Sequence, residues 1–278
     1  MIEAAVPPPY LQPMIELTLQ TVLMLTAAAF AAGFVDSIAG GGGLITIPAL
    51  LLAGFSPATA LGTNKLQGMF GSGSATIHYA ANGQVDLRRQ APSALLALVG
   101  GAVGALLATI VPGDFLRALL PVLLIAIALY FAIKPNMDDV DRAERLSPFL
   151  FAFTVVPAIG FYDGLFGPGT GSFLMLTFVA LAGYGVLKAT AHTKMLNFGS
   201  NVGGFIVFAA VGVVYWKIGL MMGVAQFIGA RVGASLAIRI GAKLIKPLLV
   251  AVCLALAAKL LADPANPLRQ LIGVWRSC

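Results

Sequence analysis

The sequence predicts an all-α polytopic membrane protein, and three observations lead to this class. The 278-residue chain is 59% hydrophobic and 10% charged, with a mean hydropathy of +0.94, whereas soluble domains carry about 25% charged residues. Uncharged runs such as Leu17–Val35 and Met195–Trp216 are long enough to cross a bilayer. Related motifs also return along the chain at a nearly constant interval. We therefore expect two homologous halves, each built from membrane-embedded helices.

The repeat rests on three blocks that recur in the same order. Lys65 in TNKLQGMFGSG corresponds to Lys194 in HTKMLNFGSN, and we call their separation along the chain the repeat interval. The block GGAVGALLA returns as GARVGASLA at the same interval. Asp36 in GFVDSIAGGGG corresponds to Asp163 in GFYDGLFGPGTG at a slightly shorter one. Repeated motifs in one order indicate repeated structural units.

Each half divides into about five apolar segments. The chain is predicted to consist of a first transmembrane repeat (1–133), a polar cytoplasmic linker (134–148) and a second transmembrane repeat (149–278). The predicted segments are 17–38, 44–55, 66–82, 90–111 and 116–133, then 149–165, 171–183, 195–214, 218–238 and 244–261. The second segment of each set is short, because about 12 helical residues span only ~18 Å of a ~30 Å hydrocarbon core. We expect these two segments to be broken or re-entrant helices.

Basic residues in short loops indicate the orientation of the segments. Arg88 and Arg89 follow the third segment of the first half, where the matching loop has only Lys217. The bias reverses after the fourth segment, where Arg239 and Lys243 lie in the second half. This pattern favours inverted repeats with five crossings each, both termini outside and the linker in the cytoplasm. Four crossings per half, in parallel halves, remain the alternative.

Glycines interrupt the apolar pattern at matching places, in Gly40–Gly43 and Gly167–Gly171. Unwinding a helix in lipid leaves backbone N–H and C=O groups unpaired unless they meet a ligand, water or another helix. Glycine also lets backbone approach a small ligand closely, and a helix that starts there points its positive end at the ligand. The predicted substrate-binding positions are Gly41, Gly42, Gly43, Gly169, Thr170 and Gly171. The alternative is that the glycines only permit tight helix packing.

Asp36 and Asp163 are the acidic residues that lie within predicted apolar segments, and they correspond in the repeat. Ionisable groups inside the membrane are costly and mark functional sites. We expect the two carboxylates to bind a coupling ion, either a proton or sodium. The alternative is that each one caps a broken helix or neutralises a nearby lysine.

Lys65 and Lys194 also correspond, near the starts of the third segments, and polar residues surround both. Two ammonium groups beside two positive helix ends favour an anion as the ligand. The polar neighbours predicted to share the site are Asn64, Gln67, Thr193 and Asn197. Snorkelling of the lysines to a membrane interface is the alternative. Arg231 has no counterpart in the first half, and it is predicted to hold substrate, pair with an aspartate or reach the interface.

The motifs resemble those of the TauE/SafE family of membrane transporters. The resemblance rests on the D-x-x-x-G-G-G-G break, on P-x-x-A-x-G-T-N (Pro57–Asn64) and on their doubled layout, from about residue 30 to 261. It implies transport of sulfite, sulfoacetate, related organosulfonates or carboxylates across a prokaryotic inner membrane. The direction of transport does not carry over from the family.

These features predict a secondary transporter of small anions that works by alternating access at a midplane site, without a cofactor or a metal. A proton- or cation-transporting carrier or channel that uses Asp36 and Asp163 is the alternative. We do not expect an enzyme, because His78 and His192 lie in different segments and no Ser/His or metal-binding cluster is evident. The expected partners are the anion, the bilayer and a coupling ion; a homodimer stays open, and nucleic acid is not expected.

Overall fold

The computed structural model describes residues 18–109 and 138–262, with scattered residues between 122 and 133. The segment predicted at 116–133 falls mostly outside the described residues. Both ends of the chain and the first residues of the predicted linker, 134–137, also lie outside them. The predicted site residues are all among the described ones.

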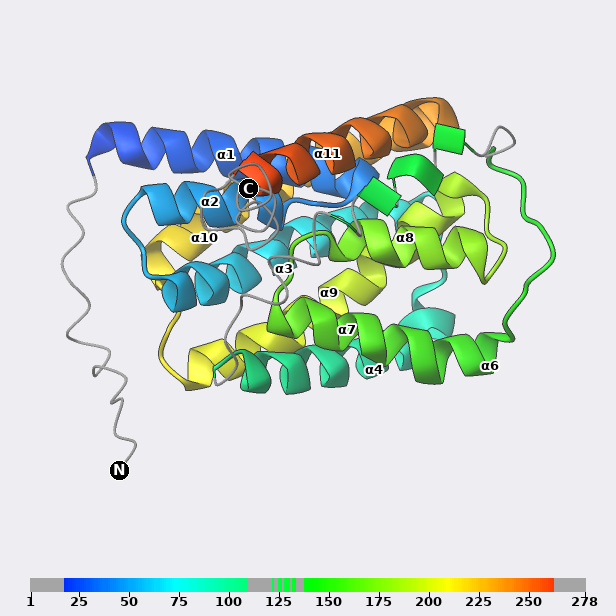
Figure 1. Ribbon diagram of the computed structural model, residues 1–278, viewed down its shortest axis with the longest axis horizontal. Helices are drawn as coiled ribbons and strands as arrows, with labels where there is room; N and C mark the ends of the chain where they lie inside the picture. The colour runs from blue at the N-terminus through cyan, green and yellow to red at the C-terminus, as the bar shows by residue number, and fades with distance from the viewer. Residues whose placement is uncertain are drawn as a thin grey trace, which may run out of the picture.

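The described residues form a bundle of helices (Figure 1). In chain order these are α1 (Leu19–Ala39), α2 (Gly43–Leu52), α3 (Pro57–Ala81), α4 (Leu87–Ala108), α6 (Pro148–Leu150), η2 (Phe151–Val155), α7 (Val156–Leu165), α8 (Thr170–Ala180), α9 (Val186–Ala210), α10 (Trp216–Ile240) and α11 (Ala242–Ala262). Within this part of the chain, four helices are long and apolar enough to cross a membrane: α1, α4, Pro148–Leu165 and α10. The predicted all-α polytopic membrane class is confirmed.

The third segment of each half is longer than predicted. α3 begins at Pro57 rather than at 66, and α9 begins at Val186 rather than at 195. The expectation was wrong because it began each helix after a group of polar residues, which were taken to lie outside the helix. In the bundle those residues are buried against other helices, so they continue the helix. The start of α3 has its own local signal, since Ser56 accepts a hydrogen bond from the backbone N–H of Thr59 and Pro57 occupies the first turn.

The glycine breaks turn the chain back on itself. In Figure 1, α2 returns to the end of the bundle at which α1 begins, and α8 returns to the end at which α6 begins. The short helices are therefore the second arms of helical hairpins (Figure 1). Two successive crossings and a shallow re-entrant hairpin both return the chain to the end at which it entered, so the number of crossings in each half stays a prediction.

The two halves share helix bounds at one interval. α3 and α9 each have 25 residues, and their first residues, Pro57 and Val186, are separated by the repeat interval. Gly54 and Gly83 have positive φ, as do Gly183 and Gly212 at the same interval. Figure 1 shows α3 and α9 running in opposite directions along the bundle. The division into two inverted repeats, and the side of the membrane that each loop faces, stay predictions.

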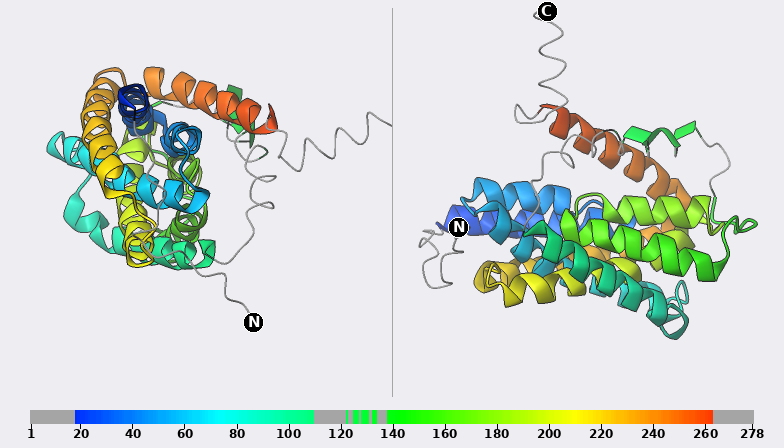
Figure 2. Two further views of the ribbon diagram at one scale, coloured as in Figure 1. Left: turned by 90° about the vertical axis from the view of Figure 1, so that its left-hand side faces the viewer. Right: turned by 60° about the horizontal axis from the view of Figure 1, so that its bottom comes forward.

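Small residues fasten each half to the other. α4 packs on α7, where a β-carbon added at Gly104 would lie 2.0 Å from the backbone oxygen of Phe161. α10 packs on α1 in the same way, with Gly229 2.1 Å from the backbone oxygen of Phe30 by the same measure. The repeated glycine blocks are thus helix-packing seams, as such small residues are between membrane helices. Figure 2 shows the resulting bundle, with α11 along its edge.

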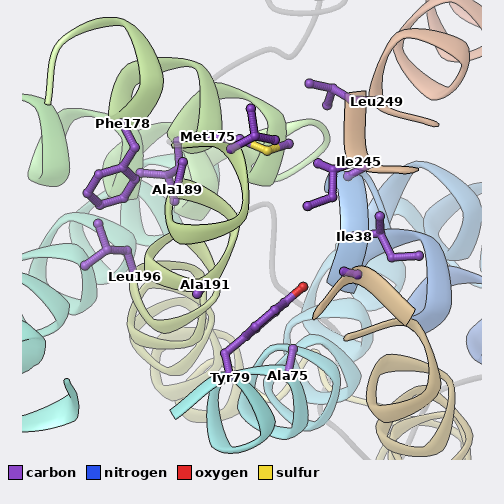
Figure 3. Close-up of a cluster of buried hydrophobic side chains, with 14 of the residues drawn as sticks. Ile38, Ala75, Tyr79, Met175, Phe178, Ala189, Ala191, Leu196, Ile245 and Leu249 are labelled. Carbon is purple, nitrogen blue, oxygen red and sulfur yellow. The ribbon is translucent and has the colours of Figure 1, made fainter. Parts of the chain in front are cut away.

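A buried cluster of apolar side chains surrounds the end of α1 (Figure 3). Tyr79 of α3 lies fully buried in it, close to Ile38, and donates its hydroxyl hydrogen to the backbone oxygen of Ser37 at 2.9 Å. The last carbonyl groups of a helix have no partner within the helix. Tyr79 therefore stabilises the point at which α1 stops inside the bundle.

The described part of the linker is fastened to the second half. The Asp139 carboxylate accepts hydrogen bonds from the backbone N–H groups of Leu187, in the first turn of α9, and Ala242, at the start of α11, at 2.9 and 3.0 Å. Asp141 accepts one from Gly185 at 2.9 Å and pairs with Lys188. Acidic side chains are favourable at helix N-termini, so the linker holds the starts of two helices together.

Candidate functional site

The tips of the two hairpins meet inside the bundle. Ser172, at the start of α8, donates its hydroxyl hydrogen to the backbone oxygen of Ala39, at the end of α1, at 3.0 Å. Gly40 has φ +80°, and a β-carbon added to it would lie 2.5 Å from the backbone nitrogen of Ser172. Only glycine fits here, because both the conformation and the contact with backbone exclude a side chain. The first part of the glycine run is therefore explained by the crossing of the two hairpins.

Two buried ion pairs flank this crossing, and each joins one half of the chain to the other. Lys65 of α3 pairs with Asp163 of α7 at 2.9 Å, and Lys194 of α9 pairs with Asp36 of α1 at 3.1 Å. Both lysines are 1% exposed. They lie in the third turns of 25-residue helices, well away from the helix ends. The lysines therefore do not snorkel to an interface, and an aspartate neutralises each of them.

A small cavity lies between the pairs. It has a volume of about 30 Å³, which is room for one or two water molecules. The lining residues are Asp36, Gly41, Gly42, Gly43, Asn64, Gly68, Asp163, Gly167, Gly169, Thr170, Gly171, Asn197, Asn201 and Gln226. The two carboxylates thus face the cavity, and the two ammonium groups lie behind them. A β-carbon added at Gly171 would nevertheless lie 3.3 Å from the Lys194 Nζ, so the ammonium is close to the glycine turn.

Side-chain amides form much of the polar wall. The Asn64 Oδ1 accepts hydrogen bonds from the hydroxyl of Thr46 at 2.6 Å and from the Gln67 amide at 3.1 Å. These two bonds aim the Asn64 Nδ2 toward Gly43, whose added β-carbon would lie 3.4 Å from it. Asn197 accepts from the Nδ2 of Asn201 with both its backbone and side-chain oxygens. The wall can therefore both donate and accept hydrogen bonds.

The other predicted site residues lie outside this lining. Gln67 and Thr193 are buried beside it, and within the described residues Gln67 Oε1 and Thr193 Oγ1 have no hydrogen-bond partner. Arg231 is exposed on α10, and it is not brought to the cavity. His78 of α3, whose ring nitrogen contacts Ser235, lies close enough to Arg231 to interact with it electrostatically.

The structure adds residues that were not among the predicted site positions, namely Gly68, Gly167, Asn201 and Gln226. Gln226 is the most informative, because it is 4% exposed and its Oε1 has no partner among the described residues. Leaving a buried polar group unpaired costs about 1–3 kcal/mol. The available signal was a lone amide inside the apolar segment 218–238, at a position where the first half has Ala97.

The charges of the site cancel. Two ammonium groups and two carboxylates form the pairs, and the Asp36 carboxylate also accepts the backbone N–H of Gly42 at 3.2 Å, just before α2. The free positive potential therefore comes from the starts of α2 and α8, each worth about half a charge. An arrangement of this kind can bind an anion strongly only if one carboxylate is protonated or moves away.

Comparisons with known proteins agree with a transport role. The family described as "Sulfite exporter TauE/SafE" matches residues 25–260. The chain is 65% identical over 258 residues to the "Probable membrane transporter protein ORF9" of Sinorhizobium sp, covering 93% of this chain and 99% of that protein. It is 49% identical over 240 residues to the "Probable membrane transporter protein YfcA" of Escherichia coli (strain K12), covering 86% and 89%.

A "Probable membrane transporter protein" of Haemophilus influenzae is 42% identical over 248 residues, covering 89% of this chain and 97% of that protein. No solved structure gives a significant match.

Proposed function

Because the chain belongs to the TauE/SafE sulfite exporter family of membrane transporters, we propose that it is a secondary transporter of small anions. The proposed substrates are sulfite, organosulfonates such as sulfoacetate, or related carboxylates. Transport proceeds by alternating access at the central cavity, in a prokaryotic inner membrane. The family and the relatives are named as transporters and not as enzymes. The substrate and the mechanism are our proposal.

One observation carries the anion assignment: two fully buried lysines lie beside two glycine turns from which helices start. An anion that leaves water must have its hydration replaced, and the effective penalty is several kcal/mol per ion. Helix ends contribute at most about 2 kcal/mol each, so a full ammonium group is needed. The amide wall supplies further N–H donors to oxyanion oxygens.

The neutral charge balance suggests how transport is coupled. With both carboxylates ionised, an anion entering the cavity meets two negative groups at the wall. Protonation of Asp36 frees Lys194 and gives the site one net positive charge, which the substrate anion then neutralises. Proton and anion therefore bind together, and a pH gradient can drive the anion.

A carrier or channel for protons or cations remains the second candidate. It is supported by acceptor atoms that lack donors: among the described residues, Gln67 Oε1 and Gln226 Oε1 are buried without a partner. Sodium is bound through oxygen atoms, and carboxylate and amide oxygens supply them in Asp36, Asp163 and Gln226. This candidate predicts that neutralising the acids abolishes transport and that neutralising the lysines has little effect.

Ligand binding to paired neutral variants tests the proposal. Lys194→Met combined with Asp36→Asn removes the ammonium group without leaving a buried charge unpaired. We expect sulfite and isethionate (2-hydroxyethanesulfonate) to stabilise the purified parent against heat, since a ligand that binds only the native state stabilises it by mass action. The double variant should bind each anion more than tenfold more weakly, about 1.4 kcal/mol.

Lys217→Met is the matched control, because Lys217 is exposed at the start of α10. It should bind both anions like the parent. If the double variant also binds them like the parent while Asp36→Asn alone abolishes sodium- or proton-dependent transport, the cation carrier replaces the anion carrier.

A further inference from the structure

A second and larger cavity lies at the linker end of the bundle. Its volume is about 390 Å³, against about 30 Å³ for the central cavity. Its lining includes the turn between α3 and α4 (residues 83–86), Glu144 and Leu146 of the linker, and His192 and Leu196 of α9. We call it the linker-end cavity. It is large enough for a small organic anion, which the central cavity in this conformation is not.

Two helices connect the linker-end cavity with the central one. Lys188, His192 and Leu196 line the linker-end cavity at four-residue spacing along one face of α9, and Asn197 lines the central cavity. Phe178 of α8 lines the first space, and the start of α8 lines the second. The two cavities are therefore lined by the same two helices, α8 and α9.

The corresponding place at the opposite end of the bundle is filled. At the repeat interval, Thr63 corresponds to His192 and Tyr215 to Asp86. The backbone N–H of Tyr215 donates to the hydroxyl of Thr63 at 3.0 Å, and its ring meets Phe55 edge to face, with centroids 5.2 Å apart. A β-carbon added at Gly62 would lie 2.6 Å from the backbone oxygen of Val213. The turn between α9 and α10 thus rests directly on α3.

At the linker end the equivalent turn leaves a gap. Asp86 and His192 both line the cavity there, and a β-carbon at Gly83 would have no atom within 4 Å. The same contrast holds about two turns further along the helices. Ser93 of α4 lines the linker-end cavity, whereas its counterpart Met222 of α10 is 0% exposed.

The chemistry of the linker-end cavity suits a small organic anion that binds weakly. Its lining combines polar Gln90, Ser93 and His192 with apolar Phe151 and Phe178. This combination suits a ligand that has a charged head group on a short carbon chain. Basic Arg89 and Lys188 also line it, but so do acidic Asp86 and Glu144. A nearly neutral lining keeps affinity low, and a site on a transport path must release its ligand.

We propose that the linker-end cavity is the site at which the substrate, a small organic anion of the alkylsulfonate type, binds before it reaches the central cavity. Tyr215, seated on Thr63, closes the corresponding site at the opposite end. This inference rests on the proposed transport function. It places the open access path at the linker end of the bundle and the closed gate at Tyr215 and Thr63.

Cysteine labelling of the matched pair Ser93 and Met222 tests the inference. Each is changed to cysteine in a full-length chain that carries Cys253→Ala and Cys278→Ser, and vesicles of both orientations are treated with a membrane-impermeant maleimide. We expect Ser93→Cys to react from the linker face and isethionate to slow that reaction severalfold. Met222→Cys should not react from either face until Tyr215→Ala is added, and should then react from the face opposite the linker.

Equal labelling of the two cysteines, or no protection of Ser93→Cys by isethionate, overturns the inference. Uptake of isethionate by the parent in the same vesicles then separates the two ideas: if the parent transports it, only the access site is wrong, and if it does not, the proposed function fails as well. Should Met222→Cys not accumulate, the pair Arg89→Cys and Ile218→Cys, also separated by the repeat interval, gives the same comparison, since Ile218 is 3% exposed.

Discussion

The two buried Asp–Lys pairs correspond in the repeat but differ in their surroundings. Lys65 and Asp163 have side chains that are 2% and 3% exposed, and Lys65 also donates to the backbone oxygen of Asp163. The Asp36 side chain, which pairs with Lys194, is 10% exposed and accepts the backbone N–H of Gly42. Both carboxylates line the central cavity. The Lys65–Asp163 pair, which we call the closed pair, is the more deeply buried one, whereas Asp36 is also bonded to the start of a helix.

This difference shows that two Asp–Lys pairs of the same composition can have different roles. An aspartate beside a helix N-terminus keeps a favourable partner when its lysine moves, because the backbone N–H and the helix dipole remain. Asp36 can therefore release Lys194 at a lower cost than Asp163 can release Lys65. We infer that the Lys65–Asp163 pair mainly holds the halves together and that the Lys194–Asp36 pair responds to substrate. The exposed pair of Asp141 and Lys188 provides a reference against which the contributions of the two buried pairs to stability can be compared.

The largest expected effect is that of breaking the closed pair. Lys65→Met leaves the Asp163 carboxylate buried without a cation, which costs about 3–5 kcal/mol of stability. Titration with SDS in mixed micelles measures the free energy of unfolding. Lys65→Met with Asp163→Asn should recover most of the loss, because no charge is then left unpaired. A double variant as unstable as the single one would show that the pair is not what Lys65 contributes.

The glycine turns should differ in the same assay by a smaller amount. A β-carbon at Gly171 would lie 2.8 Å from the Cα of Gly40, so the two backbones must separate. Gly171→Ala is expected to cost about 1–3 kcal/mol, as overpacking does. At Gly43 the nearest atom would be 3.4 Å away, on the Asn64 side chain, and Gly43→Ala should stay within about 0.5 kcal/mol of the parent. Equal losses would contradict the close crossing of the hairpins.

The response to pH should separate the two aspartates. Asp36→Asn keeps an acceptor for Gly42 but cannot take up a proton, so isethionate uptake should lose its dependence on an imposed pH gradient. We expect the rate of gradient-driven uptake in proteoliposomes to fall about tenfold, or about 1.4 kcal/mol of activation free energy. Asp163→Asn should retain the dependence in whatever fraction of the protein folds. The opposite ranking would assign the responsive role to the Lys65–Asp163 pair.

The linker pair should give the smallest effect. Partial burial raises the pKa of Asp141, but the Gly185 N–H and the Lys188 ammonium outweigh it and hold that pKa below its usual value of 3.8. A depressed pKa in the folded state adds stability above the unfolded-state pKa, and this stability is lost as the pH falls through the folded-state pKa. Because both side chains are more than a third exposed, Asp141→Asn should cost at most about 1 kcal/mol at neutral pH.

Once the pH falls below the depressed folded-state pKa of Asp141, the stabilities of Asp141→Asn and the parent should converge, because the aspartate is then protonated in both states. Unfolding curves recorded at neutral and acidic pH make the comparison. A loss as large as that of Lys65→Met would mean that the linker, rather than the central pairs, dominates the stability of the second half.

Features that depend on neighbouring residues were open to prediction from the sequence. Hydrophobic runs set the helices, because each must cover its backbone in lipid, and glycines set the breaks in Gly40–Gly43 and Gly167–Gly171. The recurring motifs linked Lys65 with Lys194 before any contact was known. The same local reasoning failed at the starts of α3 and α9. It took buried polar residues to lie before the helix, although they are part of it.

The tertiary structure alone decided which charges meet. Lys65 pairs with an aspartate 98 residues away, and Lys194 with one 158 residues away, and no local pattern encodes such a choice. Packing also brought Gln226 to the cavity and left Arg231 outside, although both lie on α10. The physical reason is that a side chain's partner depends on the face of the helix it occupies and on the helix packed there. In a bundle tied together by contacts between its halves, those neighbours come from the other half of the chain.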